Sequence, residues 1–188
     1  MTDAEIQSFL DDKGTLWYGS TCIKNAEFDT EDMDADAECT TRYEASESRR
    51  ATAAQIISGA AQSCGISPKV LLVLLQKEQH LVQSATAPSH TQLDAATGLS
   101  CPDTADCDAR YKGFFKQVYG AAHRFKYYLN HSSNYHYHWS SLNRIQYSPN
   151  VSCGSSDVYI YNKATALLYI YTPYQPNKAA LESGDGEG

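Results

Sequence analysis

The sequence has no long apolar run and no concentration of basic residues. Its longest apolar run, residues 70–75, is far shorter than the roughly 18 residues of a membrane span, so we expect no membrane insertion. Lys and Arg number 15 against 22 Asp and Glu, which gives a formal net charge of -7. Because phosphate binding requires clustered Lys and Arg, nucleic acid is not an expected partner. The sequence also has no Cys-x-x-Cys pair, so we expect neither a zinc ribbon nor a redox motif.

The start of the chain has no basic and then apolar stretch of the kind that forms a secretory signal. The other end, residues 182–188, is rich in Gly and acidic residues and resembles a linker. We therefore expect a piece of a longer secreted protein. It would consist of one soluble domain over residues 1–181 and a flexible tail over 182–188.

Cysteine is plentiful. An even count of six indicates three disulfides and an oxidising, extracellular compartment, although buried free thiols are the alternative. The spacing favours the pairs Cys101–Cys107, Cys22–Cys39 and Cys64–Cys153. Six cysteines allow many other connectivities, so this pairing is only the first expectation.

Local signals predict a mainly helical (α+β) chain. Helices are expected over about 3–13, from a Ser48 cap to about residue 63, from Pro68 to about 79, over 109–129, and from an Asn162 cap to about 171. Residues 17–46 and 84–108 are expected to be loops, and short extended pieces are expected at 144–147 and 158–161.

The helix after Pro68 carries the most informative pattern. Residues 70–75 are apolar on every side, which predicts a central, buried helix. Glu78 follows Leu71, Leu74 and Leu75 at helical spacing and so continues the apolar stripe. A carboxyl in apolar surroundings keeps its proton to higher pH, which is what a general acid requires. The alternative is a Glu at the helix edge, in a salt bridge with Arg124, Arg144 or Lys77.

A resemblance supports the catalytic interpretation. Residues 71–79 (LLVLLQKEQ) resemble the catalytic helix of the lysozyme-like superfamily, especially its lytic transglycosylase and glucosaminidase branches. Residues 96–99 (ATGL) and 113–122 (GFFKQVYGAA) resemble segments that follow in those enzymes. The chain is also similar, at 6–10, 74–79, 101–104 and 171–177, to a group of actinobacterial secreted wall-associated proteins. The Ser that often follows the catalytic Glu is Gln79 here, and Gly98-Leu99-Ser100-Cys101 replaces Gly-Leu-Met-Gln.

This resemblance implies a lysozyme-like fold in which Glu78 is the catalytic acid. Two-carboxylate glycosidases need a second acid. Asp103, inside the expected Cys101–Cys107 loop, is the first candidate, and a turn-forming Asp is its alternative. Lytic transglycosylases manage with one Glu.

Tyrosine outnumbers phenylalanine, 14 to five. Its flat ring and polar edge suit sugars, so we expect substrate contacts from Tyr119, Tyr169, Tyr171 and Tyr174, with Gln117 as a hydrogen-bonding partner. The alternative is that these rings only cover a small core. His136 and His138 share a side of an expected strand, but two donors do not complete a tetrahedral site, so no metal or other cofactor is expected.

The sequence therefore predicts a secreted, cell-wall-associated enzyme, assumed to be monomeric, that cuts the MurNAc–GlcNAc β-1,4 bond of peptidoglycan as a muramidase or lytic transglycosylase. Two alternatives stay open. One is a glycan-binding or structural wall module with the same fold, and the other is an N-acetylglucosaminidase.

Overall fold

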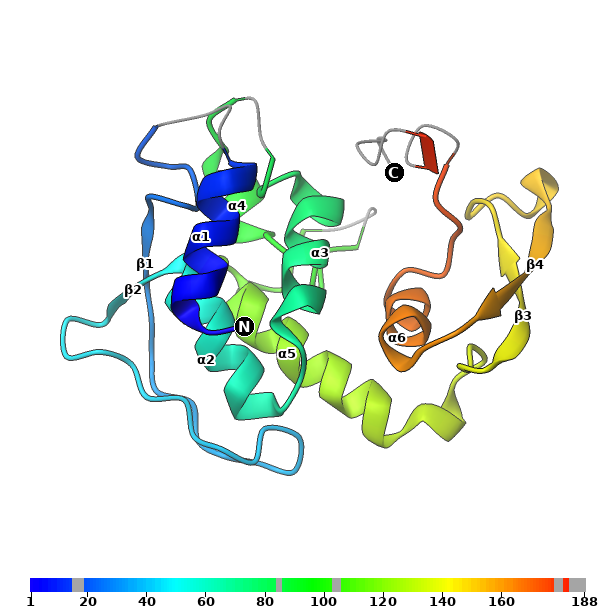
Figure 1. Cartoon of the computed structure of the whole chain (residues 1–188), viewed down its shortest axis with the longest axis horizontal. Coiled ribbons are helices and arrows are strands. Elements are labelled where there is room, and N and C mark those ends of the chain that lie inside the picture. The colour runs from blue at the N-terminus through cyan, green and yellow to red at the C-terminus, as the bar shows by residue number, and fades with distance from the viewer. Residues whose placement is uncertain (15–18, 84–85, 103–105, 178–180, 183–188) are drawn as a thin grey trace. The chain divides into compact units, whose positions relative to one another are not determined.

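The computed structural model describes residues 1–14, 19–83, 86–102, 106–177 and 181–182. The chain divides into two compact units, Met1–Lys126 and Tyr127–Gly188. Their described parts contain six α-helices and two antiparallel two-stranded sheets (Figure 1), which confirms the predicted mixed α+β class. No helix in these parts is both long and apolar enough to span a bilayer. Apart from Glu182, the predicted tail lies outside the described residues.

The first unit is built mainly from helices. They are α1 (Asp3–Lys13), α2 (Ala53–Cys64), α3 (Pro68–Gln79), the short α4 (His90–Asp94) and α5 (Phe114–Asn130), whose last turn enters the second unit. Helix α1 begins as predicted, because the Thr2 hydroxyl accepts the Glu5 N–H while the Glu5 carboxylate accepts the Thr2 N–H. It packs on α2, and α2 packs on α3.

Helix α2 begins later than predicted. Residues Arg50–Thr52 form strand β2, which pairs antiparallel with β1 (Glu27–Asp29), so the chain is still extended where a helix was expected. Thr52, not Ser48, is the N-cap and accepts the Gln55 N–H. The helix ends at Gly65, which takes the left-handed conformation with φ of 62°.

Helix α3 has the predicted bounds, with Pro68 in its first turn. Leu71, Leu74 and Leu75 are fully buried among the other helices. Val73, however, is 46% exposed, so the prediction of a helix buried on every side was wrong. Lys69, Val73 and Lys77 form an exposed stripe at helical spacing, so packing covers only the remaining face of α3.

The predicted loop over 84–108 contains α4, capped by Ser89. Helix α5 starts at Phe114 rather than near Ala109, because Gly113 has φ of 105° and interrupts the helical backbone. Residues Ala109–Tyr111 form only a 3₁₀ turn.

The second unit is a hairpin with a helix. Strands β3 (Ser141–Gln146) and β4 (Ser155–Ile160) pair antiparallel from Ser141↔Ile160 to Gln146↔Ser155. Helix α6 (Lys163–Tyr171) begins at Asn162, whose side chain accepts the Thr165 N–H as the sequence predicted. Ile145, Ile160 and Ala166 form the core of this unit.

Two disulfides are present rather than three. The predicted pair Cys101–Cys107 is confirmed. The predicted pairs Cys22–Cys39 and Cys64–Cys153 are wrong, because Cys39 bonds Cys64, Cys22 is a buried thiol and Cys153 is an exposed thiol. A non-local contact explains the difference. The segment after Cys39 runs beside the end of α2, where the Thr41 N–H donates to the Ser63 carbonyl at 3.2 Å.

Candidate functional site

Glu78 lies in the last turn of α3, where the apolar part of the helix gives way to polar residues. Its side chain is 22% exposed, so the carboxylate is largely covered but still reachable from solvent. Oε1 of Glu78 accepts a hydrogen bond from Lys77 Nζ at 2.9 Å. Lys77 is one of the three partners that the structural alternative allowed for Glu78.

Gly98 lies directly against the Glu78 carboxylate. A Cβ on residue 98 would come within 3.0 Å of Glu78 Oε2 and 3.5 Å of its Cδ. Gly98 also has φ of 70°, a conformation that side chains with a Cβ rarely adopt. Backbone conformation and space therefore both favour glycine at residue 98.

The loop that carries Gly98 is held by the side chain of Gln117 on α5. Gln117 Oε1 accepts the N–H groups of Thr97 at 3.2 Å and Leu99 at 3.0 Å. Its Nε2 donates to the carbonyls of Leu99 at 3.0 Å and Tyr111 at 2.9 Å. Gln117 is fully buried, so the structure makes it a support for the loop beneath Glu78 rather than an exposed group.

Left-handed backbone occurs on both sides of this site. His80, two residues after Glu78, has φ of 55°, and Ser100, two residues after Gly98, has φ of 54°. Non-glycine residues in this region cost free energy and are enriched at functional sites. Two of the four such residues in the described chain therefore flank the place where Glu78 meets Gly98.

The other predicted site residues fall in different places. Asp103 lies outside the described residues. Tyr119 is buried on α5, where burial and the nearby charge of Asp36 raise the pKa of its phenol. Tyr169, Tyr171 and Tyr174 are partly buried members of the second unit, and Tyr169 packs against its hydrophobic core.

A cluster that the sequence did not predict joins α5 to the loop before Cys39. His123 Nε2 lies 2.8 Å from Asp36 Oδ2 and 3.7 Å from Glu38 Oε2. Burial alone would raise the pKa of Asp36, but hydrogen bonds from the Cys39 N–H, His123 and the Glu38 N–H lower it below its ordinary value. The three side chains offer donor atoms within 4.8 Å of one another, which suits a metal ion. Ordinary ion pairing accounts for the same distances, so no metal is assigned.

Comparison with protein families gives one match. The family model described as the LasA N-terminal domain covers residues 1–180. The chain belongs to this family. No curated protein and no solved structure matches the chain. Family membership and the two disulfides are compatible with the secreted setting that the cysteines predicted.

Gly98 and Gln117 differ in how far the sequence indicated their roles. The sequence placed Gly98 in an expected loop after the helix that carries Glu78, but its contact with Glu78 depends on the fold. Gln117 interrupts the apolar stripe of Phe114, Val118 and Ala121 on α5. A polar residue on a buried helix face must be hydrogen-bonded, and that signal indicates a structural role.

Proposed function

We propose that this domain cleaves the β-1,4 bond between N-acetylmuramic acid and N-acetylglucosamine in peptidoglycan, with Glu78 as the general acid. The observation that carries the proposal is the placement of the Glu78 carboxylate. It is largely covered, lies at the end of a helix whose leucine face is buried, and rests on a glycine loop that a buried glutamine fixes. A general acid needs this combination of restricted solvent access and fixed position.

In the proposed reaction, protonated Glu78 gives its proton to the glycosidic oxygen as the bond from that oxygen to C1 breaks. Positive charge develops on C1 and the ring oxygen of the muramic acid. Either water adds to C1, which leaves a reducing end, or the sugar's own C6 hydroxyl adds, which leaves a 1,6-anhydro end. In both cases the proton lost by the attacking hydroxyl returns to Glu78. Asp103 stays the predicted second carboxylate of a two-acid hydrolase.

The Lys77–Glu78 ion pair favours a second candidate, a module that binds wall glycan without cutting it. The ammonium of Lys77 lies 2.9 Å from the Glu78 carboxylate, and such an ion pair needs no catalytic role to explain it. The two candidates differ in whether the protein changes the length of glycan strands.

The test is the clearing of a peptidoglycan suspension by the wild type and by Glu78→Gln. We expect the substitution to lower the rate by roughly 10²–10⁴-fold, because it removes the proton donor at nearly constant size. Glu47→Gln, at an exposed position, is the matched control and should keep full activity. Equal rates for the wild type and Glu78→Gln would exclude Glu78 as the acid.

Product analysis separates the enzyme classes. Mass spectrometry of released fragments should show 1,6-anhydro ends for a transglycosylase and reducing muramic acid for a hydrolase. A new reducing end at N-acetylglucosamine would assign the domain as a glucosaminidase instead. Binding to peptidoglycan with no fragments released would favour the binding module.

A further inference from the structure

A pocket of about 610 Å³ lies between β1, α4 and the start of α5 in the first unit. This volume is within the range of about 300–1,000 Å³ that is usual for small-molecule sites. Glu78 is not among the residues that line it. The pocket is therefore a feature separate from the carboxylate discussed above.

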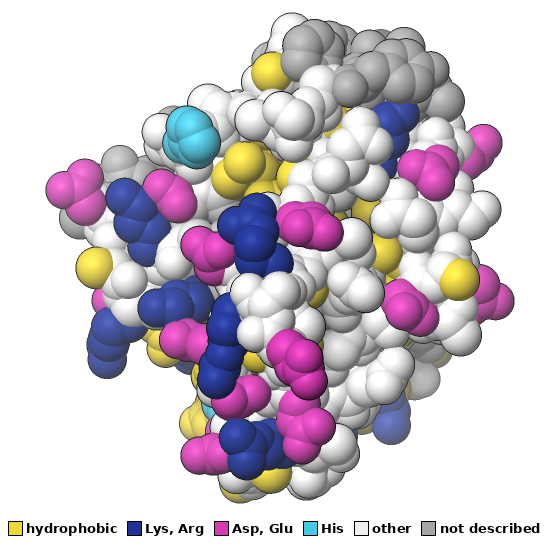
Figure 2. All heavy atoms as spheres, turned by 90° about the vertical axis from the view of Figure 1, so that its left-hand side faces the viewer, with side chains coloured by type: hydrophobic (Ala, Val, Ile, Leu, Met, Phe, Trp, Pro, Cys, Tyr) yellow, Lys and Arg dark blue, Asp and Glu magenta, His cyan; other side chains and the backbone are white. Residues whose placement is uncertain are grey.

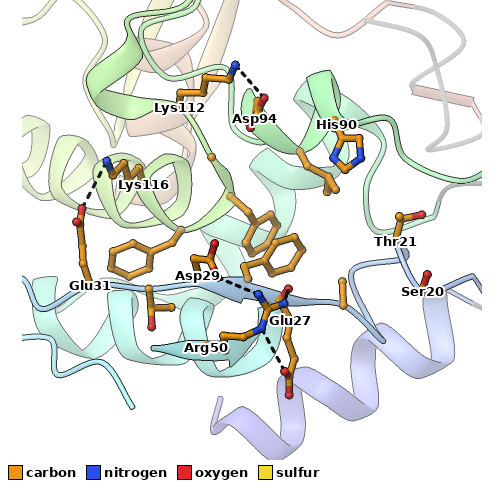
Figure 3. A pocket seen from close by; sticks show the side chains of 17 residues that line it. Ser20, Thr21, Glu27, Asp29, Glu31, Arg50, His90, Asp94, Lys112 and Lys116 are labelled. Atoms are coloured by element: carbon orange, nitrogen blue, oxygen red, sulfur yellow. Dashed lines mark hydrogen bonds and ion pairs between the residues drawn. The ribbon is translucent and has the colours of Figure 1, made fainter. Parts of the chain in front are cut away.

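Ion pairs line this pocket (Figure 3), and each Lys and Arg on its rim contacts an acidic side chain. The pairs are Arg50–Asp29 at 2.8 Å, Arg50–Glu27 at 3.6 Å, Lys112–Asp94 at 3.4 Å and Lys116–Glu31 at 3.7 Å. Acidic and basic groups also intermix across the face of the molecule shown in Figure 2. A ligand with a large charge of one sign would meet as much repulsion as attraction at this rim.

The inner surface of the pocket is aromatic. The ring of Phe28 stacks on that of Phe114 with centroids 4.0 Å apart and planes 14° apart. Phe28 is only half-buried, while Phe114 and Phe115 are buried beneath it. The pocket therefore offers an apolar ring surface between polar walls.

The hydroxyl of Thr30 is a further polar group in the wall of the pocket. The residue is 7% exposed. Its Oγ1 is buried and has no hydrogen-bond partner among the described residues. A buried hydroxyl without a partner costs free energy, but this atom is closed to solvent, so Thr30 belongs to the wall of the pocket and is assigned no ligand contact.

We propose that this pocket binds an uncharged saccharide. The carboxylates of the rim accept hydrogen bonds from sugar hydroxyls, and the Arg and Lys groups donate to hydroxyl and acetamido oxygens. The apolar C–H face of a pyranose packs on Phe28. Such a ligand uses both signs of rim charge without needing a net charge of its own. The choice of an N-acetylglucosamine chain as the sugar rests on the proposed function, whereas the saccharide class follows from the pocket.

The test uses the Glu78→Gln protein, so that the ligand is not consumed. The probe is the β-1,4-linked tetramer of N-acetylglucosamine, followed by calorimetry. Arg50→Gln, added to this protein, should weaken binding about fivefold or more, as expected for the loss of a hydrogen bond to the sugar. Arg144→Gln is the matched control and should leave affinity unchanged, because Arg144 also pairs with an acid on the neighbouring antiparallel strand, Asp157 at 3.2 Å, but lies outside the pocket. Lys116→Gln tests the opposite wall without touching the β1–β2 pairing.

Equal affinity for the Arg50→Gln, Lys116→Gln and Arg144→Gln proteins would overturn the proposal. So would binding of the tetrapeptide Ala-Glu-Lys-Ala in place of the sugar, which would make the pocket a peptide site. The proposed function fails separately. If these substitutions weaken sugar binding but the wild-type protein cleaves no peptidoglycan, only the catalytic role is refuted. Cleavage without such binding would refute only the pocket.

Discussion

Replacing Gly98 with alanine tests the contact that defines the Glu78 site. The new methyl group would lie 3.0 Å from Glu78 Oε2, so the carboxylate must move by a few tenths of an ångström. The alanine must also keep the φ of 70° that the loop requires. The substitution thus has one effect on the backbone and a separate effect on the acid.

The two effects have different magnitudes. Holding a residue with a Cβ in the left-handed region costs about 1–2 kcal/mol of folding free energy. A displacement of 1 Å at a reacting group costs on the order of 10²-fold in rate, so a shift of a few tenths of an ångström is expected to cost roughly three- to tenfold. Gly98→Ala should therefore remain folded while losing most of its activity.

Gly65→Ala provides the matched control. Gly65 has a similar φ of 62°, but its new Cβ would meet only Lys126 Nζ, at 3.4 Å. Urea denaturation should give both variants similar losses of stability, whereas peptidoglycan clearing should fall only in Gly98→Ala. If both variants lose activity equally, or Gly98→Ala keeps full activity, the close approach of residue 98 to the acid has no functional meaning.

Three further changes test the surrounding structure. Gln117→Leu leaves the N–H and C=O groups it bonds without partners and should lower the free energy of unfolding by about 3 kcal/mol or more in urea denaturation. Replacing both Cys39 and Cys64 with alanine opens a loop of sequence separation 25 and should cost about 3 kcal/mol by the same assay, and an unchanged midpoint would contradict the structural role of the disulfide. The lowered pKa of Asp36 implies stability that is fully present above the ordinary carboxyl range and lost as pH falls through the folded-state value. Asp36→Asn should therefore lower the melting temperature at pH 7, and the difference from wild type should shrink below about pH 4.

Much of the helical structure could be predicted from short-range signals. Thr2 with Glu5, Pro68 and Asn162 act within one helical turn, so the starts of α1, α3 and α6 are encoded locally. The β1–β2 pairing was missed because strands of three residues carry little periodicity and their contacts are distant in sequence.

The cysteine pairing failed for a related reason. Spacing suggested that Cys22 pairs with Cys39, but the partner depends on which distant segment lies beside the end of α2, and that segment brings Cys39 to Cys64. Glu78 was placed correctly at the end of α3, whereas its contact with Gly98 required the whole fold. Its catalytic role stays a prediction.

The hydrogen bonds of Gln117 also limit how often the loop at residues 97–99 can open. The amide hydrogens of Thr97 and Leu99 bond to a side chain of α5 rather than to neighbouring backbone. Both residues are buried, so these hydrogens can exchange with solvent only when the loop separates from α5. The loop beneath Glu78 is therefore coupled to the opening of the helical core, and it should exchange as slowly as a helix although it has no regular secondary structure.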